Sequence, residues 1–328
     1  MNETSNSTGR YGRRIAWLAV VIVVLIAVYT AGWFWLARKI EREADLALAR
    51  LQERGMKAEC ANLTARGFPF RIGLFCDRVA LEQSSDALSL TAGAFRSAGQ
   101  VYDPMRLVAE LDGPASLATP EVGALDLDWK SLRASARLAE PLPERVSVEG
   151  AGLRVSTAGG AQLVSADTFE GHMRPNGADL DLAGRFAGLT LDPAAVKGRT
   201  VPPLAGEADI SVTDGVALLG KDTRDLRGRA GTIRSLSLTL GPSGSLRLSG
   251  PFSISDDGLV DAKLMVSVQE PKALADSLAQ IFPEEAGKIN QGLVGLTFLG
   301  AQPTLPLTIN KGAVALGFIP LGKIPPVQ

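Results

Sequence analysis

The chain has 328 residues, of which 46% are hydrophobic and 5% aromatic, and its formal net charge is −1. One histidine and two cysteines exclude four-cysteine zinc sites and cysteine-ligated iron–sulfur clusters, and they argue against histidine-based catalysis. The near-neutral charge gives no sign of a nucleic-acid-binding surface. We therefore expect no nucleic-acid partner, no metal and no cofactor.

The first predicted element is a membrane-spanning helix. Residues 15–36 form 22 consecutive residues without a charge, and about 20 apolar residues cross a bilayer core as a helix. A cleaved signal peptide is the alternative, but its apolar core runs to only about 7–15 residues. Trp17 at one end of the span and Trp33 and Trp35 at the other match interfacial aromatic belts. The pattern predicts a disordered cytoplasmic tail over 1–14, a transmembrane helix over 15–36 and a helical extension over 37–55.

Charge does not orient the predicted membrane helix, because three positive residues precede the span and three follow it. The compartment of the β-rich domain is therefore inferred from the two cysteines. Cys60 and Cys76 flank a turn signal, Gly67-Phe68-Pro69, between two short strand-like runs. We expect them to face each other across a hairpin as a structural disulfide. Two buried free thiols are the alternative. Disulfides persist in oxidising compartments, so we expect an inner-membrane protein whose β-rich domain, 56–328, lies in the periplasm.

From Lys57 onward the hydrophobic period becomes two, which is typical of strands with one apolar and one polar face. Hairpin dipeptides such as Asn176-Gly177 and Asp257-Gly258 punctuate the runs. A helical pattern over 271–292, broken at Pro283, interrupts them. The predicted fold is mainly β: an elongated, curved antiparallel sheet, as an open groove or a sandwich, with a helical insertion.

One apolar sheet face is the candidate site, because flexible aliphatic side chains match an acyl chain without demanding polar partners. An ordinary filled sandwich core is the alternative, and alternation alone does not separate the two. The candidate groove residues lie in the predicted strands of the C-terminal half and are Leu236, Leu238, Leu240, Leu264, Val266, Val268, Leu296, Phe298, Leu316 and Phe318.

Catalytic patterns do not emerge. The single histidine, His172, is placed in a turn before Asn176-Gly177, and no G-x-S-x-G motif accompanies it. The glycine-rich pieces do not open a helix after a strand, as a dinucleotide-binding motif would. We therefore expect no catalytic residues and no enzymatic activity.

The segment Gly67–Ile72, GFPFRI, with Cys60 before it and Cys76-Asp77 after it, resembles the bacterial envelope proteins grouped as DUF2125. The C-terminal string GFIPLGKIPP over 317–326 resembles the ending of that family. The resemblance implies one N-terminal membrane helix and carries no catalytic residues. The strand-and-turn style is also similar, more weakly, to AsmA-like envelope proteins, which implies an apolar β groove that holds or moves lipid.

Two functions follow as expectations. The first is non-catalytic binding or transfer of a lipid or another hydrophobic ligand by the apolar groove. The alternative is a scaffold that organises an envelope complex through a filled β domain and exposed strand edges. A continuous open apolar lining would favour the first, and a close-packed core the second.

Overall fold

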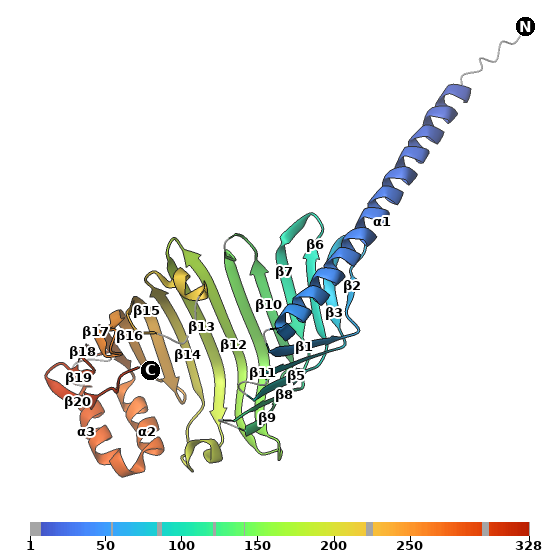
Figure 1. Cartoon of the computed structure of the whole chain (residues 1–328). Coiled ribbons are helices and arrows are strands. Elements are labelled where there is room, and N and C mark those ends of the chain that lie inside the picture. The colour runs from blue at the N-terminus through green and yellow to red at the C-terminus, as the bar shows by residue number, and fades with distance from the viewer. Residues whose placement is uncertain are drawn as a thin grey trace, which may run out of the picture.

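The computed structural model describes residues 8–53, 55–83, 87–120, 123–140, 142–220, 226–296 and 302–327. A long N-terminal helix projects from an elongated β domain, and a helical pair lies at the other end of that domain (Figure 1). The twenty described strands belong to one antiparallel sheet, which is open. The predicted fold class is therefore confirmed.

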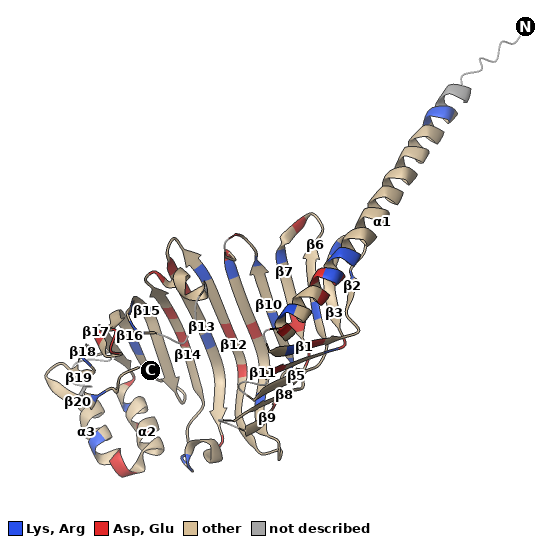
Figure 2. Ribbon diagram, viewed as in Figure 1, with Lys and Arg blue, Asp and Glu red and all other residues tan. Residues whose placement is uncertain are grey.

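Helix α1 (Thr8–Glu53) is one continuous helix. It begins inside the tail expected to be disordered, of which residues 1–7 lie outside the described part, and it has no break between span and extension. By length and composition its stretch Gly12–Glu53 could cross a membrane. No charged residue lies between Arg14 and Arg38, and Figure 2 draws a long part of α1 in tan, without charges. Gly55 follows with a left-handed backbone, φ 79°, the conformation in which glycine commonly ends a helix.

The N-terminal half of the sheet divides into two branches that meet at β11 (Arg145–Thr157). The first branch runs through β2 (Thr64–Arg66), β3 (Arg71–Cys76), β6 (Phe95–Gln100), β7 (Asp103–Leu111) and β10 (Ser131–Arg137). The second runs through β1 (Met56–Ala61), β4 (Arg78–Gln83), β5 (Leu88–Ala92), β8 (Ala115–Thr119) and β9 (Gly123–Asp128). Because β10 and β9 pair with successive parts of β11, the branches form two layers.

The disulfide between Cys60 and Cys76 is present, with Cα atoms 5.2 Å apart, but it does not bridge a hairpin. Cys60 lies on β1, which pairs with β4, and Cys76 lies on β3, which pairs with β2 and β6. The prediction that the two strands face each other across one hairpin is wrong, because β2 forms the hairpin with β3 instead. The disulfide therefore ties the two branches together at the end near α1.

The rest of the sheet is a meander in which each strand pairs with the next along the chain. Its strands are β12 (Gln162–Asn176), β13 (Asp179–Leu191), β14 (Leu204–Val212), β15 (Arg229–Leu240), β16 (Gly244–Ile254), β17 (Val260–Gln269), β18 (Thr304–Asn310), β19 (Ala313–Leu316) and β20 (Ile319–Lys323). Short 3-10 helices interrupt it at η1 (Pro193–Val196) and η2 (Gly215–Gly220). The predicted turns at Asn176-Gly177 and Asp257-Gly258 join β12 to β13 and β16 to β17.

The helical insertion comprises α2 (Pro271–Ile281), η3 (Pro283–Glu285) and α3 (Ala286–Leu296). Its break at Pro283 is as predicted, since proline lacks the N–H that would continue the helix. The prediction that Leu296 lies on a strand is wrong, because it is the last residue of α3. The helix periodicity of Ile289, Leu293 and Leu296 prevails there over the shorter alternation. Phe298 lies outside the described residues.

Candidate functional site

Aliphatic side chains form continuous rows across one face of the meander. Val146 pairs with Met173, Met173 with Leu182, and Leu182 with Ile210, across strands β11 to β14. Directly paired residues of antiparallel strands point to the same side of a sheet. We call this side the apolar face. It continues through β15 and β16, where Leu236 pairs with Leu248.

The centre of the apolar face is uncovered. Val148 and Leu182 are each 37% exposed and Leu238 is 36% exposed, although they alternate with polar residues as core positions do. Among the described residues no large side chain is fully buried. An apolar face that remains this accessible is a lining rather than a sealed core.

Helix α2 covers the C-terminal end of the apolar face. Leu274 and Ile281 of the helix pack with three candidate groove residues, Leu240, Val266 and Val268, in one buried cluster. Val266 is 7% exposed and Val268 4%. These three candidates are therefore core, because the helix that follows β17 folds back over strands β15 to β17.

The other candidate groove residues fall into different surroundings. Leu264 is buried on β17, Leu316 packs at the margin of the α2 cluster, and Leu236 is half-buried on the apolar face. Phe318 is fully exposed in the turn between β19 and β20. Leu238 is the one candidate on the exposed centre of the face.

The prediction missed the other exposed positions, Val148 and Leu182, although both lie in runs that alternate as clearly as the C-terminal ones. The signal was present in the sequence, but the position of α2 was needed to show which part of the face stays open.

The two N-terminal branches enclose the other end of the apolar face. By strand pairing, Cys76 lies in register with Phe95 on the first branch, and Cys60 with Val79 on the second. Since the disulfide joins Cys60 to Cys76, these two sides face each other. The apolar face therefore runs from between two layers, across an open sheet, to a helix-covered end.

Two phenylalanine rings of the apolar face lie against glycines of the neighbouring strand. A Cβ atom at Gly150 would come within 2.2 Å of the Phe169 ring, and one at Gly206 within 2.8 Å of the Phe186 ring. Each ring thus covers the backbone of the neighbouring strand. Glycine at these two positions therefore leaves the space on the apolar face that the rings occupy.

Two cavities open along one edge of the sheet, where β12, β14, β16 and β18 end. One, of about 820 Å³, lies beside Leu107, Ala136 and Pro175. The other, of about 810 Å³, lies beside Phe252 and Ile309. Both are within the size range of ligand sites, and both include residues of the apolar face.

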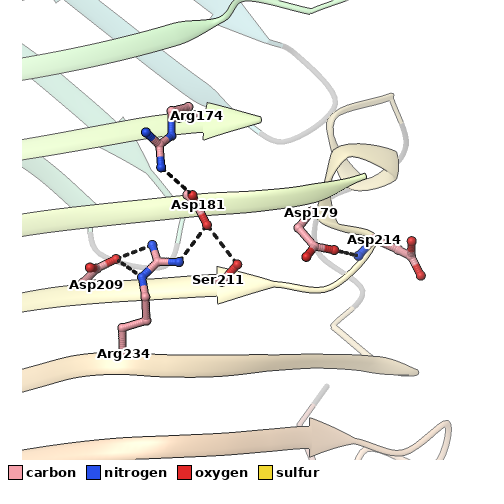
Figure 3. A network of polar contacts seen from close by, with 7 residues as sticks. All are labelled: Arg174, Asp179, Asp181, Asp209, Ser211, Asp214 and Arg234. Atoms are coloured by element: carbon pink, nitrogen blue, oxygen red, sulfur yellow. Dashed lines mark hydrogen bonds and ion pairs between the residues drawn. The ribbon is translucent and has the colours of Figure 1, made fainter. Parts of the chain in front are cut away.

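The opposite face is polar, and across strands β12 to β15 it carries a network of paired charges, which Figure 3 shows. The Asp181 side chain is 7% exposed and accepts hydrogen bonds at 2.9 Å from Arg174, Arg234 and Ser211. Arg234 also donates to Asp209. The hydrogen bonds from Arg174 and then Arg234 hold the pKa of the Asp181 carboxyl well below its usual range, against the opposing effect of burial. The network holds four strands in register.

His172 lies within β12 on this polar face, so its predicted position in a turn is wrong. Its Nδ1 is 2.9 Å from the hydroxyl of Ser147, and its Nε2 is 3.6 Å from Glu170. The strand simply extends further, to Asn176, than the turn signal indicated. Within the described ranges, no group of three or more His, Cys, Asp or Glu residues is placed to hold a metal ion.

A family model described as "Uncharacterized protein conserved in bacteria (DUF2125)" matches residues 33–325, nearly the whole chain. No curated protein and no solved structure matches the chain. The match includes the Cys-flanked segment and most of the C-terminal string on which the family resemblance was based.

Proposed function

The chain belongs to the DUF2125 family, and we propose that it is a single-pass inner-membrane protein whose periplasmic β domain binds or passes lipid acyl chains along the apolar face. The function is non-catalytic. The observation that carries the proposal is the uncovered centre of the apolar face, between a helix-covered end and a two-layered end.

The chemistry of the exposed centre suits an acyl chain. Val148, Leu182 and Leu238 present branched aliphatic groups. Binding an alkyl chain would remove apolar area from water at about 25 cal/mol per Å². Contiguous exposed apolar patches of a few hundred Å² commonly mark binding surfaces.

Two features support the membrane assignment. The apolar part of α1 is exposed from Ile15 to Tyr29, which is unfavourable in water and favourable in a bilayer. The Cys60–Cys76 disulfide is compatible with an oxidising compartment such as the periplasm. Together they support an inner-membrane anchor with the β domain outside the cytoplasm.

Site-specific photocrosslinking of the full chain in cells tests the proposal. A benzophenone amino acid is incorporated at Leu182 or Leu238 on the apolar face, and at the adjacent Ala183 or Thr239 on the polar face as matched controls. We expect lipid adducts, identified by mass spectrometry, at the two apolar positions only. Equal adduct yields on both faces, or none at either apolar position, would contradict lipid binding there.

The exposed C-terminal edge favours a second candidate, a scaffold. The edge strand β20 leaves Ile319 and Leu321 mostly exposed beside Phe318, and exposed edge strands accept partner strands. Crosslinks to a protein from position 319, without lipid adducts on the apolar face, would favour this function.

A further inference from the structure

The turn between β2 and β3 packs against the apolar span of α1. Phe68 makes ring contacts with Trp33 and Phe34, with centroids 5.5 and 5.8 Å apart. The Tyr29 hydroxyl donates a hydrogen bond to the carbonyl oxygen of Pro69. The turn is thus fixed beside residues 29–34, which lie inside the predicted span rather than beyond it.

The depth of this contact follows from the length of the helix. Arg13 and Arg14 precede the uncharged run and favour the headgroup region of the leaflet remote from the β domain, called here the far leaflet. Twenty residues counted from Ile15 end at Phe34, and at 1.5 Å per residue they cover a hydrocarbon core of about 30 Å. Tyr29 then lies inside the near leaflet, so the turn that touches it reaches the same depth.

Neighbouring strand ends add exposed apolar side chains to this turn. Phe70 is 69% exposed and Tyr102 is 76% exposed. The backbone N–H of Val101 donates to the Phe70 carbonyl oxygen at 3.0 Å, so the β2–β3 and β6–β7 turns are held together. Met105, also mostly exposed, follows at the start of β7.

We propose that these two turns, with Phe68, Phe70 and Tyr102 at their tips and Met105 beside them at the start of β7, insert into the outer leaflet of the bilayer that α1 crosses. This inference rests on the proposed membrane anchor. Arg106, the residue after Met105, lines the cavity of about 820 Å³ that lies beside Leu107 and Ala136. The inserted turns would therefore place an opening of the apolar face at the membrane surface, where lipid enters directly from the leaflet.

Spin-label depth measurement on the full chain in liposomes tests the insertion. Nitroxides are attached after the substitutions Phe70→Cys, Tyr102→Cys, Val24→Cys and Phe318→Cys, one per variant. The native cysteines are paired in the disulfide, and peptide mapping verifies that pairing. Val24 reports the membrane core, and Phe318, an equally apolar and fully exposed residue, lies at the opposite end of the sheet.

We expect labels at positions 70 and 102 to collide with oxygen more than with a water-soluble nickel chelate, as at position 24. The label at position 318 should show the reverse preference. If positions 70 and 102 behave like 318 while position 24 reports lipid, insertion is refuted and the anchor stands. If position 24 reports water, the anchor fails as well.

Discussion

Leucine-to-alanine substitutions at two positions of the same sheet face separate an open lining from a packed core. Leu264 on β17 is 6% exposed and pairs with Leu307 of β18, whereas Leu238 on β15 is 36% exposed and pairs with Gly206. The two residues are chemically identical and both lie in central antiparallel strands. Only their packing differs. The difference between Leu264→Ala and Leu238→Ala in the loss of unfolding free energy therefore measures that packing.

The magnitudes follow from burial. Removing three carbons from a buried side chain costs roughly 2.4 kcal/mol at about 0.8 kcal/mol per methylene, and a residual cavity raises the cost to within about 2–5 kcal/mol. We expect Leu264→Ala to lower the free energy of unfolding by about 3 kcal/mol. For Leu238→Ala we expect about 1.5 kcal/mol, because only about two thirds of the side chain is buried and the space left is open to solvent.

The assay is chemical unfolding of the full chain in one detergent, followed by far-ultraviolet circular dichroism with the bound lipid removed. Wild type, Leu264→Ala and Leu238→Ala are compared at the same denaturant slope, so that the midpoints report stability. A gap of about 1 kcal/mol or more between the variants is expected. Equal losses of about 3 kcal/mol would show that Leu238 is packed, and the open-face interpretation would be refuted.

Three further predictions concern the features that hold the sheet together. Replacing both Cys60 and Cys76 by serine should lower the free energy of unfolding by about 3 kcal/mol, the value for closing a loop of about 15 residues; a denaturant midpoint unchanged from the oxidised protein would contradict it. Asp181→Asn should cost about 2 kcal/mol in the same assay, since it leaves the Arg174 and Arg234 guanidiniums without their shared carboxylate, a cost reduced by their partial exposure; no loss would show that the network contributes nothing. Because the pKa of Asp181 is depressed, its contribution is fully present above the ordinary carboxyl pKa of about 4 and is lost as the pH falls below that value; unfolding at a series of pH values should show the wild type approaching Asp181→Asn under acid conditions, and a constant difference would contradict the assignment.

Much of the fold follows from alternation in the sequence. The run Leu236, Leu238, Leu240 predicts a strand with one apolar side, and the structure has it in β15. The same alternation, however, occurs at Val266 and Val268, which α2 covers, and at Leu238, which lies outside the α2 cluster and is 36% exposed. The two-residue alternation of apolar side chains determines which face of the sheet is apolar. The place where helix α2 packs on the sheet determines which part of that face is buried.

The apolar face of the sheet was therefore predictable from the sequence, whereas the part of it that stays exposed was not. The disulfide was predicted from the turn signal and the strand-like runs between Cys60 and Cys76. The division of the sheet into two branches was not predicted, because these local signals do not show that β1 pairs with β4. The strand expected to include Leu296 failed for a related reason: a short apolar run does not distinguish strand from helix. In the structure, the helical insertion that begins with α2 continues through α3 to Leu296.

Native mass spectrometry of the full chain, released from detergent micelles, tests the central claim most directly. Wild type is compared with Leu182→Asp and Leu238→Asp, which place a charge on the exposed apolar face, and with Ala183→Asp, which places one on the polar face. We predict a lipid-sized additional mass on the wild type and on Ala183→Asp, and its loss from the other two variants at unchanged folding. No bound lipid on the wild type, or equal lipid occupancy in all four proteins, would contradict the claim that the apolar face binds lipid.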